Sequence, residues 1–278
     1  MNLKKINLLN SKNVLITNNN LNSMLSLSGL IKKNPSLFSL IIITKSISPK
    51  QNNFTTIFRL IKKAGFKFVF FKLTTNLFIP FFLKILNKPV SVTKKIKELN
   101  GVAEIIYTSN VNEELIFSKI QEFSPDTILA AGAAHIIHER IINLSKIFSI
   151  NIHSSLLPEY AGSSPYFWVL KNNEKKTGAT IHQMNNKVDS GDIYLQKAIN
   201  IENDDSLLSL SQKISKINNE ILLMFFMNSF NKPVKQNLKN RTHFKSPAKA
   251  DIDDFNRNKK KFLTFKHLID YLKYVLEF

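Results

Sequence analysis

The segment Ser149–Lys197 reads SINIHSSLLPEYAGSSPYFWVLKNNEKKTGATIHQMNNKVDSGDIYLQK, and it decides how we interpret the rest of the chain. It opens with a short apolar run that ends at Asn151 and His153. Side chains alternate between the two faces of a strand, so these two side chains point to the same side. Ser154 then breaks the strand into a loop, and open α/β sheets bind their ligands at such strand ends. The segment therefore predicts a polar site at the end of a buried strand.

An acidic turn follows in the same segment. The sequence Val188-Asp189-Ser190-Gly191-Asp192 comes just before a new apolar run that starts at Ile193. An Asp in a turn commonly bonds its own backbone, so either acidic residue could be structural. The turn nevertheless offers a carboxylate to the loop layer in which Asn151 and His153 end.

These residues resemble a known family. The runs NIHxSLLPxYxG, PxxW, TGATIHxM and VDSGDI are similar to those of the N-10-formyltetrahydrofolate-dependent formyltransferases, which include methionyl-tRNA, glycinamide ribonucleotide and amino-sugar formyltransferases. The resemblance is dense over 126–196 and thin elsewhere. It implies that Asn151, His153 and Asp189 are the catalytic residues, because they stand in the family's order and spacing. Asp192 is then expected to be a turn or strand-cap residue.

The chemistry of formyl transfer suits these three residue types. The reaction passes through a tetrahedral carbon that carries an oxyanion, and the Asn151 amide and His153 can stabilise that oxygen. The attacking amine must lose a proton, which Asp189 or a water that it orients can take. We also expect the charge of Asp189 to favour the protonated form of His153 if the two lie close together.

The same resemblance implies that 10-formyltetrahydrofolate is the formyl donor. In the family, main-chain groups after the strand that corresponds to 126–132 pair with the pterin ring of the folate. The expected contacts with the folate are Ala134, His135, Ile136, Ile137, Asn185 and Val188.

Three further residues are candidates for contact with the acceptor. Ser155 either contacts the acceptor or only orients its loop. Asn18 lies in a run of three Asn at a turn that is often Gly-rich in relatives that bind phosphorylated acceptors; Asn tolerates left-handed backbone and can donate from its side chain. Gly162 stands where backbone is expected to approach a ligand closely.

Apolar runs alternate with helical patterns on both sides of the central segment. Strands are expected at 13–17, 37–44 and 102–107, with helices between them, as in a parallel sheet. We predict an α/β fold with a Rossmann-like, mostly parallel sheet flanked by helices, a basic Phe-rich insertion and a short C-terminal appendage. The expected boundaries are 1–205 for the catalytic domain, 45–97 for the insertion within it, and 206–278 for the C-terminal helix and appendage.

The composition is that of a globular protein, with 44% hydrophobic residues in 278 and no cysteine. The lack of cysteine excludes disulfides and thiolate nucleophiles and agrees with a reducing cytoplasm. His135 and His138 are accompanied by no carboxylate cluster, so no metal is expected. Residues 1–100 hold 17 Lys or Arg against one acid, whereas 101–200 hold 8 against 10. This basic excess suggests a surface for an anionic partner, such as phosphates or lipid headgroups.

The expected insertion, 45–97, holds 12 basic residues, nine Phe and no acidic residue. Its longest uncharged run, Leu73–Leu83, has 11 residues and contains Pro80. A bilayer needs about 20 apolar residues, so we do not expect a spanning helix. Three interpretations remain: a folded helical lid that packs Phe on the core, a surface for nucleic acid, and an interfacial membrane anchor.

Together these features predict an enzyme that transfers a formyl group from 10-formyltetrahydrofolate to a primary amine. The 47 residues of 232–278 are too few for the β-barrel that the resemblance associates with methionyl-tRNA formyltransferases. A nucleotide- or lipid-linked amino sugar is therefore favoured as acceptor. Methionyl-tRNA, a hydrolase that releases formate and a non-catalytic folate-binding protein are the alternatives.

The expected partners and location follow from that function. The main partner is a small, phosphate-bearing amine, with tRNA and an anionic membrane as further candidates; DNA is not expected. The expected location is the cytoplasm, including the inner face of the membrane.

Overall fold

The computed structural model describes residues 7–44, 61, 62, 64–228, 230 and 232–278. The strands are β1 (Asn13–Thr17), β2 (Phe38–Thr44), β3 (Glu104–Thr108), β4 (Thr127–Ala131), β5 (Phe148–His153), β6 (Ala161–Gly162), β7 (Lys176–Gln183), β8 (Ile193–Asn200) and β9 (His243–Phe244). The α-helices are α1 (Leu21–Lys33), α3 (Phe66–Leu73), α4 (Ile79–Ile85), α5 (Val92–Glu98), α6 (Glu114–Phe123), α7 (Glu139–Ile142), α8 (Pro165–Lys171), α9 (Leu207–Phe226), α10 (Lys249–Arg257) and α11 (Phe265–Leu276). The π-helical turn η3 (Thr74–Phe78) and the 3-10 turns η2 (Leu8–Asn10) and η4 (Leu238–Asn240) complete the described elements.

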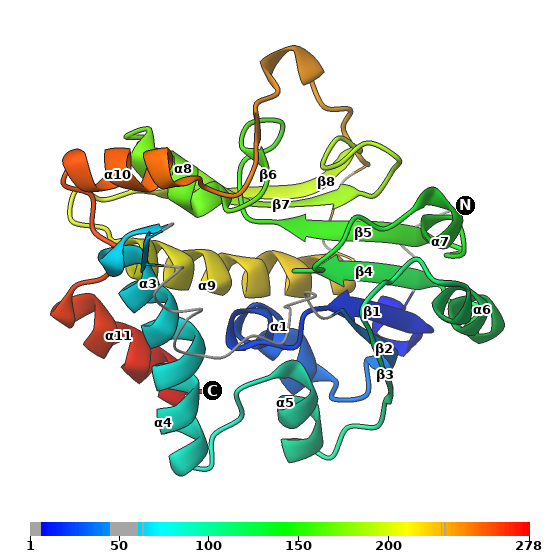
Figure 1. Ribbon diagram of the computed structural model, residues 1–278. Helices are drawn as coiled ribbons and strands as arrows, with labels where there is room; N and C mark the ends of the chain where they lie inside the picture. Colours follow the sequence, from blue (N-terminus) through cyan, green and yellow to red (C-terminus); the bar gives the residue numbers. More distant parts are fainter. Residues whose placement is uncertain (1–6, 45–60, 63, 229, 231) are drawn as a thin grey trace.

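Seven strands form one sheet in the order β3-β2-β1-β4-β5-β7-β8, and helices lie on both faces of it (Figure 1). The strands from β3 to β5 are parallel, whereas β7 and β8 join in antiparallel pairing. The predicted fold class, a Rossmann-like and mostly parallel sheet flanked by helices, is confirmed. A separate ladder joins β6 to β9, which are far apart in the sequence.

The two faces of the sheet are covered by different helices. Along β1, Leu15 packs into the cluster that contains α1 and α9, whereas its neighbours Val14 and Ile16 pack into the cluster that contains α6 and α7. This alternation is the two-residue period of a strand that is buried on both sides. It explains why the strands read as continuous apolar runs in the sequence.

Helices α1 and α9 pack against each other under the sheet (Figure 1). Each begins at a polar residue whose side chain accepts a hydrogen bond from the backbone three residues later: Asn20 for α1 and Ser206 for α9. Such caps satisfy a backbone donor at the helix start. Between the helices, the Gly29 N–H donates to Asn219 Oδ1 at 2.8 Å. The two helices pack together against one face of the central strands.

The part of the expected insertion that the structure describes is helical except around 86–91, while 45–60 and Lys63 lie outside the described residues. Residues Phe66–Ile85 form one continuous helix of 20 residues through α3, η3 and α4. By length and composition alone it is able to cross a membrane, which the sequence did not predict. The sequence analysis counted only the uncharged run Leu73–Leu83, which contains Pro80, whereas the helix continues beyond both ends of that run and places this proline near the start of α4.

The segments before and after the expected boundary at 205 share one hydrophobic cluster. Phe255, Phe262 and Tyr271 belong to the same cluster as Leu15 in β1 and Phe148 in β5. In Figure 1, α10 lies beside α8, and α11 lies beside α3 and α4. The C-terminal residues therefore contribute to the core that positions the site.

Candidate active site

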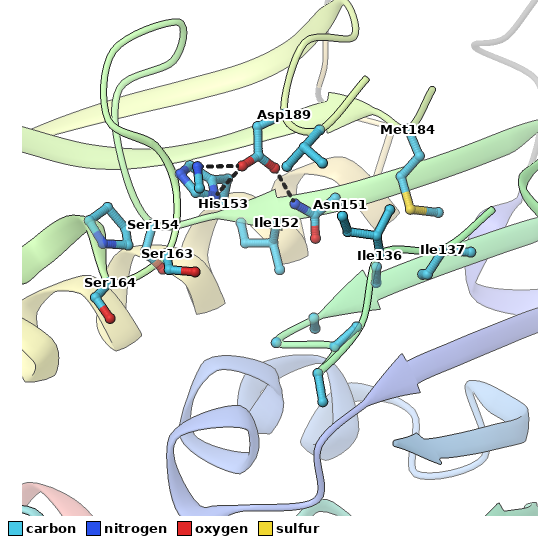
Figure 2. Close-up of a pocket in the computed structure, with 18 of the residues that line it drawn as sticks. Ile136, Ile137, Asn151, Ile152, His153, Ser154, Ser163, Ser164, Met184 and Asp189 are labelled. Carbon is cyan, nitrogen blue, oxygen red and sulfur yellow. Dashed lines mark hydrogen bonds and ion pairs between the residues drawn. The ribbon is translucent and has the colours of Figure 1, made fainter. Parts of the chain in front are cut away.

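A cavity of about 940 Å³ opens where the parallel strands β4 and β5 end. Its walls come from the loop after β4, the end of β5, the loop before β8 and the segment that contains β9, and Asn218 of α9 also lines it. Figure 2 shows the polar and apolar parts of this wall. The position matches the rule that open α/β sheets bind ligands at the carboxyl ends of their strands.

Asn151, His153 and Asp189 point toward one another in this cavity (Figure 2). Asp189 Oδ2 lies 3.6 Å from His153 Nδ1, and Asp189 Oδ1 lies 3.5 Å from Asn151 Nδ2. The Gly162 N–H donates to Asp189 Oδ2 at 2.8 Å. The structure thus brings together the three residues that the sequence predicted as catalytic, and Gly162 with them.

His182 is part of this group, although the sequence analysis did not name it. It is the direct cross-strand partner of Asn151 in the antiparallel pair of β5 and β7. Asn151 Nδ2 lies 3.1 Å from His182 Nε2, which is itself 3.5 Å from Asp189 Oδ1. The signal was present, since His182 is the histidine of the TGATIHQM run, but only the pairing of β7 with β5 places it here.

The hydrogen bonds determine which ring nitrogens carry a proton. His153 Nε2 faces the main-chain oxygen of Tyr160 at 2.9 Å, and His182 Nδ1 faces that of Gln183 at 2.8 Å. A carbonyl oxygen only accepts, so both of these nitrogens are donors. In the neutral rings, His182 Nε2 then accepts from the Asn151 amide, and His153 Nδ1 is the nitrogen with a free lone pair beside Asp189.

The pKa of His153 and the pKa of Asp189 are both lowered, so the imidazole is favoured in its neutral form and the carboxyl in its ionised form. Burial lowers the pKa of His153 from its ordinary value of 6.5, and this outweighs the opposite effect of Asp189. Asp189 does favour the protonated ring, as expected, since its charge raises the pKa of His153, but desolvation of the enclosed imidazole is the larger effect. Burial also opposes ionisation of Asp189, but His153, His182 and the Gly162 N–H together hold the pKa of this carboxyl below its ordinary value of 3.8.

The residues expected to contact the folate lie along one side of the cavity. Ile136, Ile137 and Met184 appear beside Asn151 in Figure 2. Two backbone groups of the loop are already used, since the Ala134 N–H donates to Thr44 Oγ1 and the Ile136 carbonyl accepts from Asn112. All six predicted folate contacts line the cavity: Ala134, His135, Ile136, Ile137, Asn185 and Val188.

His135 adds a polar atom to this apolar wall. Its Nδ1 is buried, and within the described part of the chain it has no hydrogen-bond partner. Burying a polar group without a partner is costly unless a ligand or water satisfies it. The side of the cavity where the folate is expected therefore contains a buried polar atom whose partner is not among the described residues.

Two predicted acceptor contacts lie elsewhere. Ser155 is fully buried, and its hydroxyl donates to the Glu159 carbonyl at 2.9 Å. Asn18 accepts a hydrogen bond from Ser23 at 2.8 Å in the turn before α1. Neither lines the cavity, so their placement does not support contact with the acceptor. Both side chains form hydrogen bonds within their own turns, as short polar residues often do.

Residues near the C-terminus donate hydrogen bonds to main-chain carbonyls of the loop that carries Asp189. Gln236 Nε2 donates to the carbonyls of Gly191 at 2.6 Å and of Asp189 at 3.2 Å. Arg241 donates to the Val188 carbonyl at 3.0 Å. We call 236–244 the C-terminal strap; it ends in β9, which pairs with β6 at Gly162. The sequence analysis missed this contribution, because single long-range hydrogen bonds leave no periodic pattern.

Within the described residues, no group of three or more His, Cys, Asp or Glu is arranged to hold a metal ion. The polar groups gathered around Asp189 are the Asn151 amide, the imidazoles of His153 and His182, and the Gly162 N–H. This set can accept a proton and stabilise an oxyanion.

Comparison with known proteins identifies a family and several related chains. The sequence matches the model of the Formyl transferase family over residues 47–225. The bifunctional polymyxin resistance protein ArnA of Wigglesworthia glossinidia brevipalpis is 38% identical over 141 residues, which cover 49% of this chain and 22% of ArnA. Methionyl-tRNA formyltransferase of Caldicellulosiruptor saccharolyticus is 37% identical over 133 residues, which cover 48% of this chain and 42% of that enzyme. The chain therefore spans less than half the length of either relative.

Solved structures share the fold. A sugar N-formyltransferase from Shewanella sp FDAARGOS_354 superposes with a TM-score of 0.52 at 19% sequence identity. The match covers 95% of this chain and 87% of that one, so it extends to the C-terminal elements.

Proposed function

The chain belongs to the Formyl transferase family, and on that premise we propose that it transfers a formyl group from 10-formyltetrahydrofolate to a primary amine. The observation that carries this proposal is the convergence of Asn151, His153 and Asp189, with both Asp189 contacts within 3.6 Å. The cavity beside them is lined by the loop Ala134–Ile137, on the side where the folate is expected.

Asn151 is the group that stabilises the oxyanion in this proposal. Its amide has two N–H bonds, of which one reaches His182 at 3.1 Å and the other reaches Asp189 at the longer distance of 3.5 Å. The longer contact is the weaker one. A bound formyl oxygen that becomes an oxyanion would replace it. Loss of one such donor typically costs about 10² to 10³ in rate.

Asp189 and His153 take the proton of the attacking amine. The carboxylate is ionised, and the imidazole is neutral with Nδ1 facing it, so two proton acceptors lie side by side. The amine must lose a proton as its nitrogen bonds the formyl carbon, and the folate nitrogen must gain a proton as its bond to that carbon breaks. General base catalysis of this kind contributes about 10² to 10⁴ in rate.

We propose an amino sugar linked to a nucleotide or lipid as the acceptor. The C-terminal strap and the residues after it supply His243, Phe244, Lys245 and Ser246 to the cavity wall, which leaves a bounded site beside the catalytic groups. A phosphate-bearing acceptor would meet Lys245 there. The similarity to methionyl-tRNA formyltransferase keeps a charged tRNA as the second candidate.

The test is an acceptor panel. The chain is incubated with 10-formyltetrahydrofolate and with amino-sugar nucleotides or charged initiator methionyl-tRNA. Mass spectrometry follows addition of a formyl group to each acceptor, while absorbance follows the donor. We expect an amino-sugar nucleotide to gain the group.

Asp189→Asn is the inactive comparison, because it keeps the shape of the side chain and removes the base. Asp192→Asn is the matched control in the same turn and should stay active. Donor consumption that leaves every amine unmodified would indicate a hydrolase, and donor binding with no consumption would indicate a non-catalytic homologue.

A further inference from the structure

The helix Phe66–Ile85 carries an exposed apolar surface outside the cavity. We call it the apolar face. Each of its seven large side chains keeps between 43% and 66% of its area exposed. Monomeric soluble proteins rarely expose such contiguous apolar patches unless another surface covers them. The apolar face consists of Phe66, Phe70, Leu77, Phe78, Phe81, Phe82 and Ile85.

The opposite side of the same helix is fixed to the domain. Phe71, Ile79 and Leu83 are buried in the main hydrophobic cluster. Phe71 and Phe68 also contact the ring of Phe262 at centroid distances of 5.9 and 5.6 Å. The helix thus lies along the surface of the molecule, beside α11 (Figure 1). It is anchored on one side, and none of the described residues covers the other, which favours contact in a plane over crossing a bilayer.

The π-helical turn keeps the apolar face continuous. Phe70 and Phe78 are eight residues apart, as are Phe71 and Ile79. Eight residues of a regular α-helix rotate through about 800°, which would separate each pair by roughly 80°. The turn Thr74–Phe78 takes up one extra residue, so the effective separation falls to roughly 20°. Exposed residues therefore stay on one side through both α3 and α4, and buried residues on the other.

Lysines border the apolar face. Lys67 follows Phe66 and Lys84 precedes Ile85, so each lies about 100° of rotation from the face, on opposite sides of it. Both lysines are exposed. The sequence contains no acidic residue from 61 to 97. The charge that this segment itself contributes around the face is therefore of one sign.

We propose that the apolar face docks on the surface of an anionic lipid bilayer, with the helix in the plane of the interface. Phosphates alone would not account for seven exposed apolar side chains, and hydrocarbon alone would not account for the lysine border. An anionic bilayer supplies both, since Phe and Leu enter the headgroup boundary while Lys meets the lipid phosphates. The inference is independent of the acceptor that the cavity takes.

Vesicle flotation of the full chain tests this proposal. Vesicles of phosphatidylcholine alone are compared with vesicles that also contain phosphatidylglycerol, at low and at high salt. We expect binding that requires the anionic lipid and decreases with salt, because the lysine contribution is screened. Phe78→Ser combined with Phe81→Ser should lower the vesicle partition coefficient at least about tenfold, since both side chains lose their burial in lipid.

Matched variants separate docking from general effects. Leu115→Ser changes a side chain that is 62% exposed on α6, and it should leave vesicle binding unchanged. Lys67→Glu with Lys84→Glu should weaken binding to anionic vesicles, whereas Lys146→Glu should not. Circular dichroism verifies that each variant is folded, and formyl transfer to a soluble acceptor should persist in all of them. Equal binding to neutral vesicles, binding that survives the double Phe variant, or no binding by the folded chain would each overturn the proposal.

Discussion

At the scale of single residues, Asp189 connects most of the catalytic groups. Its backbone has a φ of +50°, a conformation that Asp tolerates better than most residues. In this conformation Oδ2 receives the Gly162 N–H while both oxygens face side chains of the central strands. The carboxylate therefore stays ionised without a Lys or Arg, next to an imidazole that stays neutral.

The sequence revealed only part of this arrangement. Asn151, His153 and Asp189 could be predicted because they stand in a dense motif with fixed spacing. His182 stands in an equally clear run, but its role depends on the antiparallel pairing of β7 with β5, and strand neighbours are not encoded in local periodicity. The charge state of His153 depends on burial, which no spacing reveals.

Replacement of His153 tests its part in the transfer. His153→Ala should lower kcat for formyl transfer at least about a hundredfold, because a group next to the reacting atoms is lost, while donor binding stays near normal. Steady-state kinetics and folate titration measure the two effects. His138→Ala is the control, since His138 is exposed and outside the cavity. Near-normal turnover in His153→Ala would remove this residue from the mechanism.

The pH profile tests the charge states. The pKa of His153 is lowered below 6.5, so the neutral ring that the fold favours persists to more acidic pH than in a free histidine. The stability from this shift is full above pH 6.5 and is lost as the pH falls below that value toward the folded pKa. We expect kcat/KM to stay level from neutral pH and to fall only below pH 6.5. An acidic limb centred above 6.5 would show that the charge of Asp189 outweighs the effect of burial on the pKa of His153.

At the scale of elements, the site depends on strands that end at one edge and on a strap that returns to them. The main strands could be predicted to within about two residues from their apolar runs. Within the part of the chain that the sequence analysis described only as a short appendage, residues Lys249–Arg257 form the helix α10. The two-residue ladder of β6 and β9 was not predicted, because it is too short to carry a two-residue alternation.

The C-terminal strap should affect catalysis through the position of Asp189. Gln236→Ala leaves the carbonyls of Asp189 and Gly191 without this donor, at a cost of about 1–3 kcal/mol if the groups stay buried. We expect lower kcat and a modest loss of thermal stability, with donor affinity largely kept. Lys239→Ala, at an exposed position in the same segment, serves as control. Equal kcat in the two variants would mean that the loop of Asp189 keeps its conformation without the hydrogen bonds from Gln236.

At the scale of the whole molecule, one hydrophobic cluster joins β1, the Phe66–Ile85 helix and the last helices. A short appendage was predicted from the number of residues that remain after α9. Their burial in the core could not be predicted from the sequence, since aromatic residues at helical spacing occur on core helices and on surface helices alike.

Phe255 measures how strongly the C-terminal helices stabilise the fold. Its ring is fully buried and lies 4.9 Å from that of Phe167 and 4.6 Å from that of Phe262. Phe255→Ala should lower the free energy of unfolding by about 3–5 kcal/mol, because a large core side chain is removed. Urea denaturation gives the value, and Phe265→Ala, at a position 78% exposed, should change it little. A small change for Phe255→Ala would mark 206–278 as a separable unit.

The dependence of Asp189 on the C-terminal strap also has a consequence for biosynthesis. A ribosome delivers β1 to β8 first, so every catalytic side chain has been synthesised before the strap that secures the loop of Asp189. The loop of Asp189 is secured only when Gln236 and Arg241 have emerged and β9 has added to β6. Competence for turnover should therefore arrive as a late event in translation, after the strap has joined the fold.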